Sequence, residues 1–385
     1  MTVIPRIEDF ADELTAIRHD QHAHPEIGFE EVRTSGVVAE RLAAWGIEVH
    51  RGLGATGVVG VLKGRREGSR TVGLRADMDA LPIEERTNLP YRSTSPGRMH
   101  ACGHDGHTTM LLGAARYLAE TRDFAGTVHF VFQPAEEGLG GARAMLADGL
   151  FERFPCDEIY GLHNSPTLPL GQVAVFPGRA MAGASLFDIR IHARGAHAAR
   201  PQDARDPVIV ATALAQAMQS VVSRDVDPLE AAVLSITRIE AGSAYNVIPE
   251  TASMAGTLRY FEDAVAETMR TRMRAIAAGF AAAFEVEIDV DIRDVFTVLE
   301  NAEAEAAHLA EAARDVVGEA GVLTEPRPVT GSEDFADMLR AVPGAYCWVG
   351  HGGGVALHNP GFVLDDRILP VGASLLARVV ERRLA

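Results

Sequence analysis

The stretch Thr127–Gly138, TVHFVFQPAEEG, decides how the chain is expected to fold, because it joins a buried strand to a polar turn. Its first half, Val128–Phe132, is an apolar run typical of a buried strand. Its second half places Glu136 and Glu137 just after that strand. In open α/β sheets ligands bind outside the carboxyl ends of strands, and adjacent carboxylates there are costly unless they are paired or hold a metal. A solvated acidic loop is the alternative interpretation.

Strand and helix patterns alternate on both sides of this stretch, which predicts the α/β fold class. The other expected strands are Val58–Leu62, Val72–Arg75 and Ile159–Leu162. Apolar residues at helical spacing predict helices at Ile7–His22, Glu31–Trp45 and Thr108–Leu118. The sequence therefore predicts a mixed, largely parallel sheet flanked by helices.

A second domain is expected between residues 182 and 292, where the order of elements is self-contained. Its expected strands are Leu186–Ala193, Ala232–Glu240, Ser253–Tyr260 and Phe284–Ile292, and its helices are Pro207–Val222 and Asp263–Ala282. The order strand, helix, two strands, helix, strand is the ferredoxin-like α+β unit. The patterns then resume with the helix Ala302–Glu319, the strand Ala345–Val349 and the helix Leu369–Leu384. We therefore expect residues 1–181 and 293–385 to form one discontinuous domain around the insertion.

Length, charge and cysteine content limit the class of protein. A chain of 385 residues exceeds the size at which one core usually stops growing, which favours two domains. The net charge of −17 argues against nucleic acid or an anionic membrane as a partner. Three widely spaced cysteines are typical of a reducing compartment, and the N-terminus does not resemble a signal peptide. A cytoplasmic protein is expected.

The segment Met99–His107, MHACGHDGH, is the strongest candidate for metal binding. It places one thiol, three imidazoles and a carboxylate just before a predicted helix, and Cys and His are ligands that transition metals prefer. A polar capping loop is the alternative. His163 follows another apolar strand in GLHN, and His358 in LHNPGF adds an imidazole from the C-terminal segment. Because several strand ends deliver such residues to one edge, a shared metal site is expected there.

Asp79, in RADMDALP, also follows a predicted strand. A carboxylate there could orient a ligating imidazole and set its tautomer. The alternative is a structural aspartate that caps the turn before Pro82.

Taken together, these motifs resemble the M20 metallopeptidase family. The chain is similar to its branch of hippurate hydrolases, N-acyl amino acid amidohydrolases and auxin-conjugate hydrolases over nearly its whole length. The matching motifs, in the family's order, are RADMDALP, MHACGHDGHT, QPAEEG, GLHN, GAHAARP, NVIPE, GSEDFA and LHNPGF. Many relatives have histidine after the proline of GAHAARP, where this chain has Gln202. That departure leaves the acyl or side-chain preference open.

The resemblance implies hydrolysis of the amide bond of small N-acyl amino acids, with two divalent metal ions of zinc, manganese, cobalt or nickel. The implied metal ligands are Cys102 as the shared ligand, His104, Glu137, His163 and His358. Glu136 would be the catalytic base, acting on a water whose pKa the metals lower.

The resemblance also implies that the inserted domain is a lid that mediates dimerisation, in a homodimer or a higher oligomer. His197 would reach the neighbouring subunit's site and stabilise the oxyanion. Asn246 and Arg259 would contact the substrate, and Arg259 suits a carboxylate because its guanidinium can bind in a bidentate manner.

Two other motifs lack the sequence context that their usual functions require. Gly52–Gly57 matches the dinucleotide pattern G-x-G-x-x-G, but a strand follows it instead of a helix, so a hairpin turn is expected. The segment from His351 to Gly354 resembles a lipase oxyanion loop, yet the chain has no G-x-S-x-G motif. A dipeptidase or carboxypeptidase remains open, and so does a metal-binding protein without turnover, which would have no use for Glu136.

Overall fold

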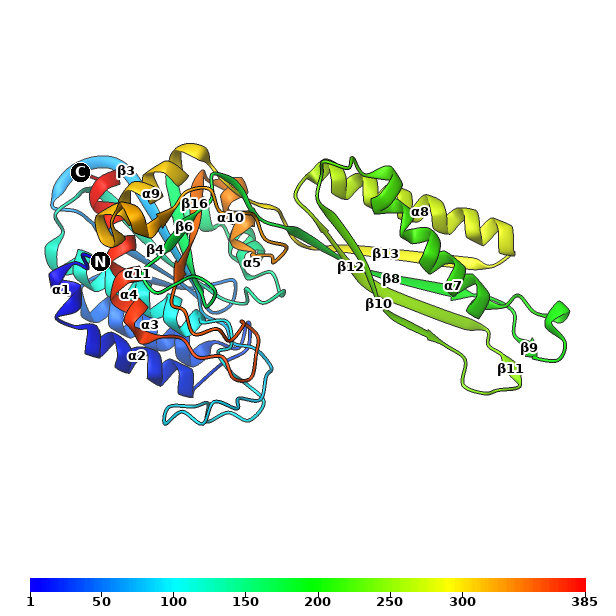
Figure 1. The fold of residues 1–385 in the computed structure, drawn as a ribbon. Coiled ribbons are helices and arrows are strands. Elements are labelled where there is room, and N and C mark those ends of the chain that lie inside the picture. Colours follow the sequence, from blue (N-terminus) through cyan, green and yellow to red (C-terminus); the bar gives the residue numbers. More distant parts are fainter. The chain divides into compact units, whose positions relative to one another are not determined.

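The computed structural model describes residues 1–385, which form two compact units. The first unit contains residues 1–180, 299–328 and 333–385, and the second contains residues 181–298 and 329–332. Figure 1 shows the elements of both. None of the helices is long and apolar enough to cross a membrane.

The first unit is built on an eight-stranded mixed sheet in the order β1-β2-β4-β3-β5-β16-β6-β15. The central strands β4, β3, β5 and β16 run parallel to one another, whereas β1 and β2 pair antiparallel with their neighbours. Strand β6 is antiparallel to β16 and parallel to β15. The strands are β1 (Glu48–Leu53), β2 (Gly57–Lys63), β3 (Arg66–Asp77), β4 (Ala125–Gln133), β5 (Glu158–Ser165), β6 (Val173–Val175), β15 (Val322–Leu323) and β16 (Gly344–Gly350). A separate short pair joins β7 (Gly178–Met181) to β14 (Leu299–Asn301). The predicted α/β class with a mixed sheet is confirmed.

Helices cover this sheet and complete a single core. The main ones are α2 (Ala11–Ala23), α3 (Val32–Ala44), α4 (His104–Thr121), α9 (Glu303–Val317) and α11 (Leu369–Arg383), and the short ones are α1 (Pro5–Glu8), α5 (Gly141–Ala147), α6 (Leu150–Arg153) and α10 (Phe335–Ala341). Strand β5 is buried at every position, and α4 packs against both α2 and α11. Burial of this kind explains why the central strands have continuous apolar runs instead of alternating ones.

The local predictions differ from the structure mainly at element ends. The helix expected at Ile7–His22 is divided into α1 and α2, and the helix expected from Thr108 already begins at His104. Strand β1 was not predicted, because Glu48–Leu53 contains three charged or polar residues and buries only Leu53. It pairs antiparallel with β2, so the predicted hairpin turn at Gly52–Gly57 is confirmed.

The second unit has the expected ferredoxin-like order β8-α7-β10-β12-α8-β13. Its four strands form an antiparallel sheet in the order β10-β12-β8-β13. The elements are β8 (Gly183–His192), α7 (Pro207–Met218), β10 (Ala232–Ala241), β12 (Thr251–Tyr260), α8 (Asp263–Phe284) and β13 (Glu287–Phe296). Both helices pack on the sheet, and Figure 1 shows them on one of its faces. Because α8 continues to Phe284, β13 begins three residues later than the expected Phe284.

A two-stranded ribbon extends from the second unit. It pairs β9 (Ala196–His197) with β11 (Val247–Ile248). His197 lies directly opposite Val247 in this ribbon.

Candidate metal centre

Three parallel strands end at the same edge of the first unit's sheet and deliver polar side chains there. Strand β3 leads to Asp77 and Asp79, β4 to the turn with Glu136 and Glu137, and β5 contains His163. After β4 the chain turns sharply at Ala135, whose φ of 53° is unusual for a residue with a side chain. Such backbone conformations are costly and recur at functional sites.

The loop before α4 approaches the end of β5 closely. Gly103 has a φ of 99°, and a Cβ atom built there would lie 2.1 Å from Nδ2 of Asn164. The Asn164 amide donates a hydrogen bond to the Cys102 carbonyl across this contact. Only glycine allows the thiol and imidazole of this loop to reach the strand edge.

The first group of potential ligand atoms contains Cys102, His104 and His163, all of them buried. The Sγ of Cys102 lies 3.3 Å from Nε2 of His163. His163 Nδ1 donates to the Asn164 carbonyl at 2.6 Å, which leaves Nε2 as the nitrogen with a lone pair. Burial lowers the pKa of His163 well below its usual range. The ring is therefore neutral, as a metal ligand must be.

The second group contains Cys102, Glu137 and His358, so that the thiol belongs to both groups. The Nε2 of His358 lies 3.3 Å from Oε1 of Glu137, and the Nε2 of His104 lies 3.9 Å from the same oxygen. Neither contact is a hydrogen bond, since Glu137 Oε1 and His104 Nε2 are both buried without any hydrogen-bond partner. Orphaned buried polar atoms are rare and call for an explanation.

The donor atoms of this arrangement suit divalent cations. Burial and the Glu137 carboxylate raise the pKa of the Cys102 thiol, so a thiolate here needs an adjacent positive charge. Contacts with Cys102 and Glu137 raise the pKa of His358 to about 10, so a metal must displace a proton from it. A thiol, three imidazoles and a carboxylate form a donor set suited to zinc and similar transition metals.

Asp79 contacts one residue of each group through its two carboxylate oxygens. Its Oδ1 lies 3.1 Å from His104 Nδ1, and its Oδ2 accepts a hydrogen bond from the Glu137 backbone N–H at 3.0 Å. The first contact turns Nε2 of His104 toward the other ligand atoms. This geometry fits an orienting role better than a turn cap before Pro82.

Asp77 and His107 form a second supporting pair, to which sequence reasoning assigned no role. His107 Nδ1 donates to Asp77 Oδ1 at 2.7 Å, and its Nε2 accepts from the Asn164 backbone N–H at 2.9 Å. Both ring nitrogens are thus occupied. Arg75, fully buried, pairs with the other Asp77 oxygen at 2.8 Å and with Glu333 at 2.9 Å. The residues lie in motifs already recognised, but spacing alone did not distinguish a supporting imidazole from a ligating one.

Glu136 lies beside the two groups and is only 6% exposed. Its carboxylate is near His104 and Glu137 on one side and near Glu333 and Asp334 on the other. Its Oε1 accepts a long hydrogen bond of 3.4 Å from the Asp334 backbone N–H. Burial first, and then the charges of Glu333 and Glu137, raise its pKa well above the usual value. A carboxylate that binds a proton this readily suits general base chemistry near neutral pH.

The remaining candidates, His197, Asn246 and Arg259, belong to the second unit. His197 and Asn246 share the β9–β11 ribbon, where the Ala198 N–H donates to the Asn246 carbonyl at 3.0 Å. His197 Nδ1 accepts from the Ala199 N–H at 3.0 Å, which leaves Nε2 as the donor nitrogen. Arg259, near the other end of β12, pairs with no carboxylate.

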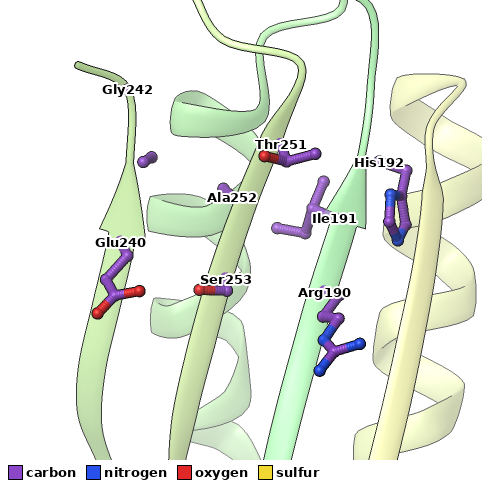
Figure 2. A pocket seen from close by; sticks show the side chains of 9 residues that line it. Arg190, Ile191, His192, Glu240, Gly242, Thr251, Ala252 and Ser253 are labelled. Carbon is purple, nitrogen blue, oxygen red and sulfur yellow. The ribbon is translucent and has the colours of Figure 1, made fainter.

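A separate hollow on the open face of the second unit's sheet contains none of the candidate residues. Figure 2 shows Glu240, Ser253 and Arg190 side by side on β10, β12 and β8, with Thr251 and His192 beyond them. Its lining is a mixed set of small, polar and charged side chains, as expected for a solvated sheet face.

Comparison with known proteins agrees with this geometry. Residues 73–382 match the peptidase family M20/M25/M40. The chain is 41% identical to a hippurate hydrolase of Campylobacter jejuni over 384 residues, covering 100% of both chains. It is 38% identical to an N-acetylcysteine deacetylase of Bacillus subtilis, covering 96% of both. A crystal structure of a Bacillus subtilis protein, described as a dinuclear metal-binding peptidase of the M20 family, superimposes with a TM-score of 0.85 at 34% identity, covering 98% of this chain and 99% of that one.

Proposed function

Because the chain belongs to the peptidase family M20/M25/M40, we propose that it is a metal-dependent amidohydrolase that cleaves the amide bond of small N-acyl amino acids. Relatives named hippurate hydrolase and N-acetylcysteine deacetylase, similar over nearly the whole chain, support this substrate class. One observation carries the proposal. Two groups of ligand atoms share Cys102 and lie beside the buried carboxylate of Glu136.

Two divalent cations would be held by the two groups. Cys102, His104 and His163 would hold one, and Cys102, Glu137 and His358 would hold the other. The donor set suits zinc, manganese, cobalt or nickel. When bound, such cations polarise the amide carbonyl and lower the pKa of the attacking water from about 15.7 toward neutrality.

The chain's own groups then move the protons and fix the substrate. Glu136 accepts the proton of the attacking water on its carboxylate and passes it to the departing nitrogen of the amide. The raised pKa of Glu136 makes its protonated form accessible, as this shuttle requires. Asp79 keeps His104 and Glu137 oriented throughout.

The second unit would supply the remaining contacts. His197 presents Nε2–H, which can donate to the oxyanion, a contribution worth about 3 kcal/mol in other enzymes. The Arg259 guanidinium has no carboxylate partner and is suited to the substrate carboxylate, and Asn246 lies on the ribbon of His197. We further propose that residues 182–292 form a lid and dimerisation domain.

Cysteine content and net charge indicate the compartment and the class of partner. Three free cysteines, one of them a proposed ligand, favour a reducing cytoplasm. The net charge of −17 favours a small-molecule substrate over nucleic acid or a membrane surface.

A substrate panel tests the proposal. Turnover of hippurate and N-acetylmethionine is compared with that of an unblocked dipeptide, with Zn²⁺, Mn²⁺, Co²⁺ or Ni²⁺ added. We expect the N-acyl compounds to be cleaved with the higher kcat/KM. Preference for the unblocked dipeptide would indicate a peptidase instead. Bound metal without any turnover would indicate a binding protein.

The base assignment has its own test in Glu136→Gln. The amide of glutamine fits the same space but cannot accept a proton, so kcat should fall about 10²- to 10⁴-fold. Metal content and the free energy of unfolding should match those of the wild type. Equal activity of the variant would refute the role of Glu136.

A further inference from the structure

The segment between the strand β3 and the Cys102 loop forms a long irregular excursion, residues 82–98, which we call the 82–98 loop. Its two ends are closed by a pair of backbone hydrogen bonds of 3.0 Å between Leu81 and Met99. It contains no helix or strand. Loops of this length without secondary structure are uncommon in compact domains and are often functional.

The loop is anchored in the protein by a buried carboxylate. Glu85 accepts hydrogen bonds from Thr87 Oγ1 and from the Ser93 backbone N–H, the latter at 2.6 Å, so it ties two parts of the loop together. Its Oε1 also lies 3.4 Å from His22 Nε2. The Glu85 side chain is only 4% exposed and that of His22 is fully buried.

The anchor continues to the Cys102 loop through buried charges. His22 Nδ1 lies 2.7 Å from Oδ2 of Asp105, and the same oxygen accepts a hydrogen bond from Arg18 Nε at 2.9 Å. Asp105 follows His104 directly at the start of α4. Such a paired and hydrogen-bonded cluster is rigid, because leaving any one of its charges unpaired is costly.

The loop also holds the segment that contains His358. The Arg86 backbone N–H donates to the Pro360 carbonyl at 2.8 Å. The His358 N–H donates to the Ala101 carbonyl, also at 2.8 Å, so the segment is held by two neighbours. His358 itself has a φ of 62° and a side chain that is 52% exposed. A residue with a side chain keeps that conformation only when its surroundings impose it.

We propose that the 82–98 loop is a clamp that sets the position of His358, with Glu85 and the Arg86 N–H as positioning groups for the cation held by Cys102, Glu137 and His358. This inference rests on the proposed function, because it takes His358 to be a metal ligand. Among the ligand residues, only His358 lies in the segment to which the Arg86 N–H is bonded, whereas Cys102 precedes α4, His104 begins α4 and His163 lies in β5. The clamp therefore predicts a selective effect on one of two metal sites.

The test compares two substitutions at one position. Arg86→Pro removes the N–H that donates to Pro360, whereas Arg86→Ala removes the same side chain and keeps the N–H. Metal-free protein is titrated with Zn²⁺, and binding is followed by calorimetry. We expect two Zn²⁺ per chain for the wild type and for Arg86→Ala. In Arg86→Pro one of the two Zn²⁺ affinities should fall about 10- to 100-fold while the other is unchanged.

Several outcomes overturn the clamp. It fails if Arg86→Pro binds both Zn²⁺ ions as the wild type does. If Arg86→Pro does not fold, Glu85→Gln decides instead, because it keeps the shape of the side chain and removes the charge facing His22. Loss of one Zn²⁺ affinity alone in Glu85→Gln supports the clamp, and unchanged or equally weakened binding of both ions refutes it. A wild type that binds no Zn²⁺ would refute the proposed function itself, a result distinct from all of these.

Discussion

At the scale of single residues, Asp79 connects the two ligand groups, because each of its oxygens holds a different one. Asp79→Asn keeps the size of the side chain but offers one acceptor oxygen, so the contact with His104 or that with the Glu137 N–H is lost. We expect Zn²⁺ affinity to fall about 10- to 100-fold, as measured by titration of the metal-free protein.

The control for Asp79 is Asp20→Asn. Asp20 is exposed and pairs with Arg33 on the surface, where such pairs contribute little. Zn²⁺ affinity should be unchanged there. If both variants bind Zn²⁺ like the wild type, Asp79 orients nothing and is a structural residue.

The contribution of Glu85 to the free energy of unfolding should depend on pH. Burial acts to raise its pKa, but hydrogen bonds from His22, Thr87 and the Ser93 backbone prevail and lower it from 4.5 to about 2. Because the folded-state pKa lies below the unfolded one, the carboxylate stabilises the fold fully above about pH 4.5, and this contribution is lost as the pH falls toward 2. The difference in free energy of unfolding between the wild type and Glu85→Gln should therefore shrink as the pH falls from about 4.5 toward 2. Urea unfolding at a series of pH values measures it, and a difference that does not change with pH would contradict the assignment.

At the scale of elements, the loop before α4 depends on a glycine. Gly103→Ala would place a Cβ 2.1 Å from Asn164 at a φ of 99°, so both a clash and backbone strain arise. We expect a loss of about 1–3 kcal/mol in the free energy of unfolding, measured with urea.

Gly97→Ala is the matched control for Gly103. Its φ is 73°, and nothing lies within 4 Å of the added Cβ. Gly97→Ala therefore introduces backbone strain but no clash. The loss should be smaller than for Gly103→Ala. Equal losses would mean that the close approach to Asn164 is of no consequence.

Helix α2 shows why the sequence predicts where a helix lies but not which of its polar residues are buried. Periodicity predicted a helix there, and the structure has one. Yet the buried face of α2 includes Arg18, Gln21 and His22, polar residues that apolar spacing alone does not place in a core. Partners distant in sequence, Asp105 and Glu85, make the burial of Arg18 and His22 possible. The spacing of residues within one helix cannot predict partners that are so distant in sequence.

At the scale of the whole molecule, the proposed dimer makes a prediction about mixed subunits. His197→Ala and Glu136→Ala should each be inactive alone. If His197 acts on the partner's site, a mixed dimer contains one site with both residues intact. The two variants are mixed in equal amounts, unfolded and refolded together. Half of the dimers are then mixed, and each mixed dimer has one complete site of two. We therefore expect about a quarter of the wild-type activity.

Two results would argue against that arrangement. Absence of any recovery would place His197 in the site of its own chain. Elution of the protein as a monomer in size-exclusion chromatography would remove the basis of the proposal.

The sequence by itself determined the α/β class, the ferredoxin-like order of the second unit and the candidate ligands, because buried strands, helical spacing and metal-binding residue types are local properties of the chain. Only the tertiary structure decided that Cys102 belongs to two groups of ligand atoms, that Asp79 holds His104 and Glu137 together, and that His107 is occupied by Asp77 and Asn164. These relations join residues from different strands and loops. They exist only after parallel strands bring their carboxyl ends to one edge, and the burial created there sets which nitrogen or oxygen is left without a partner.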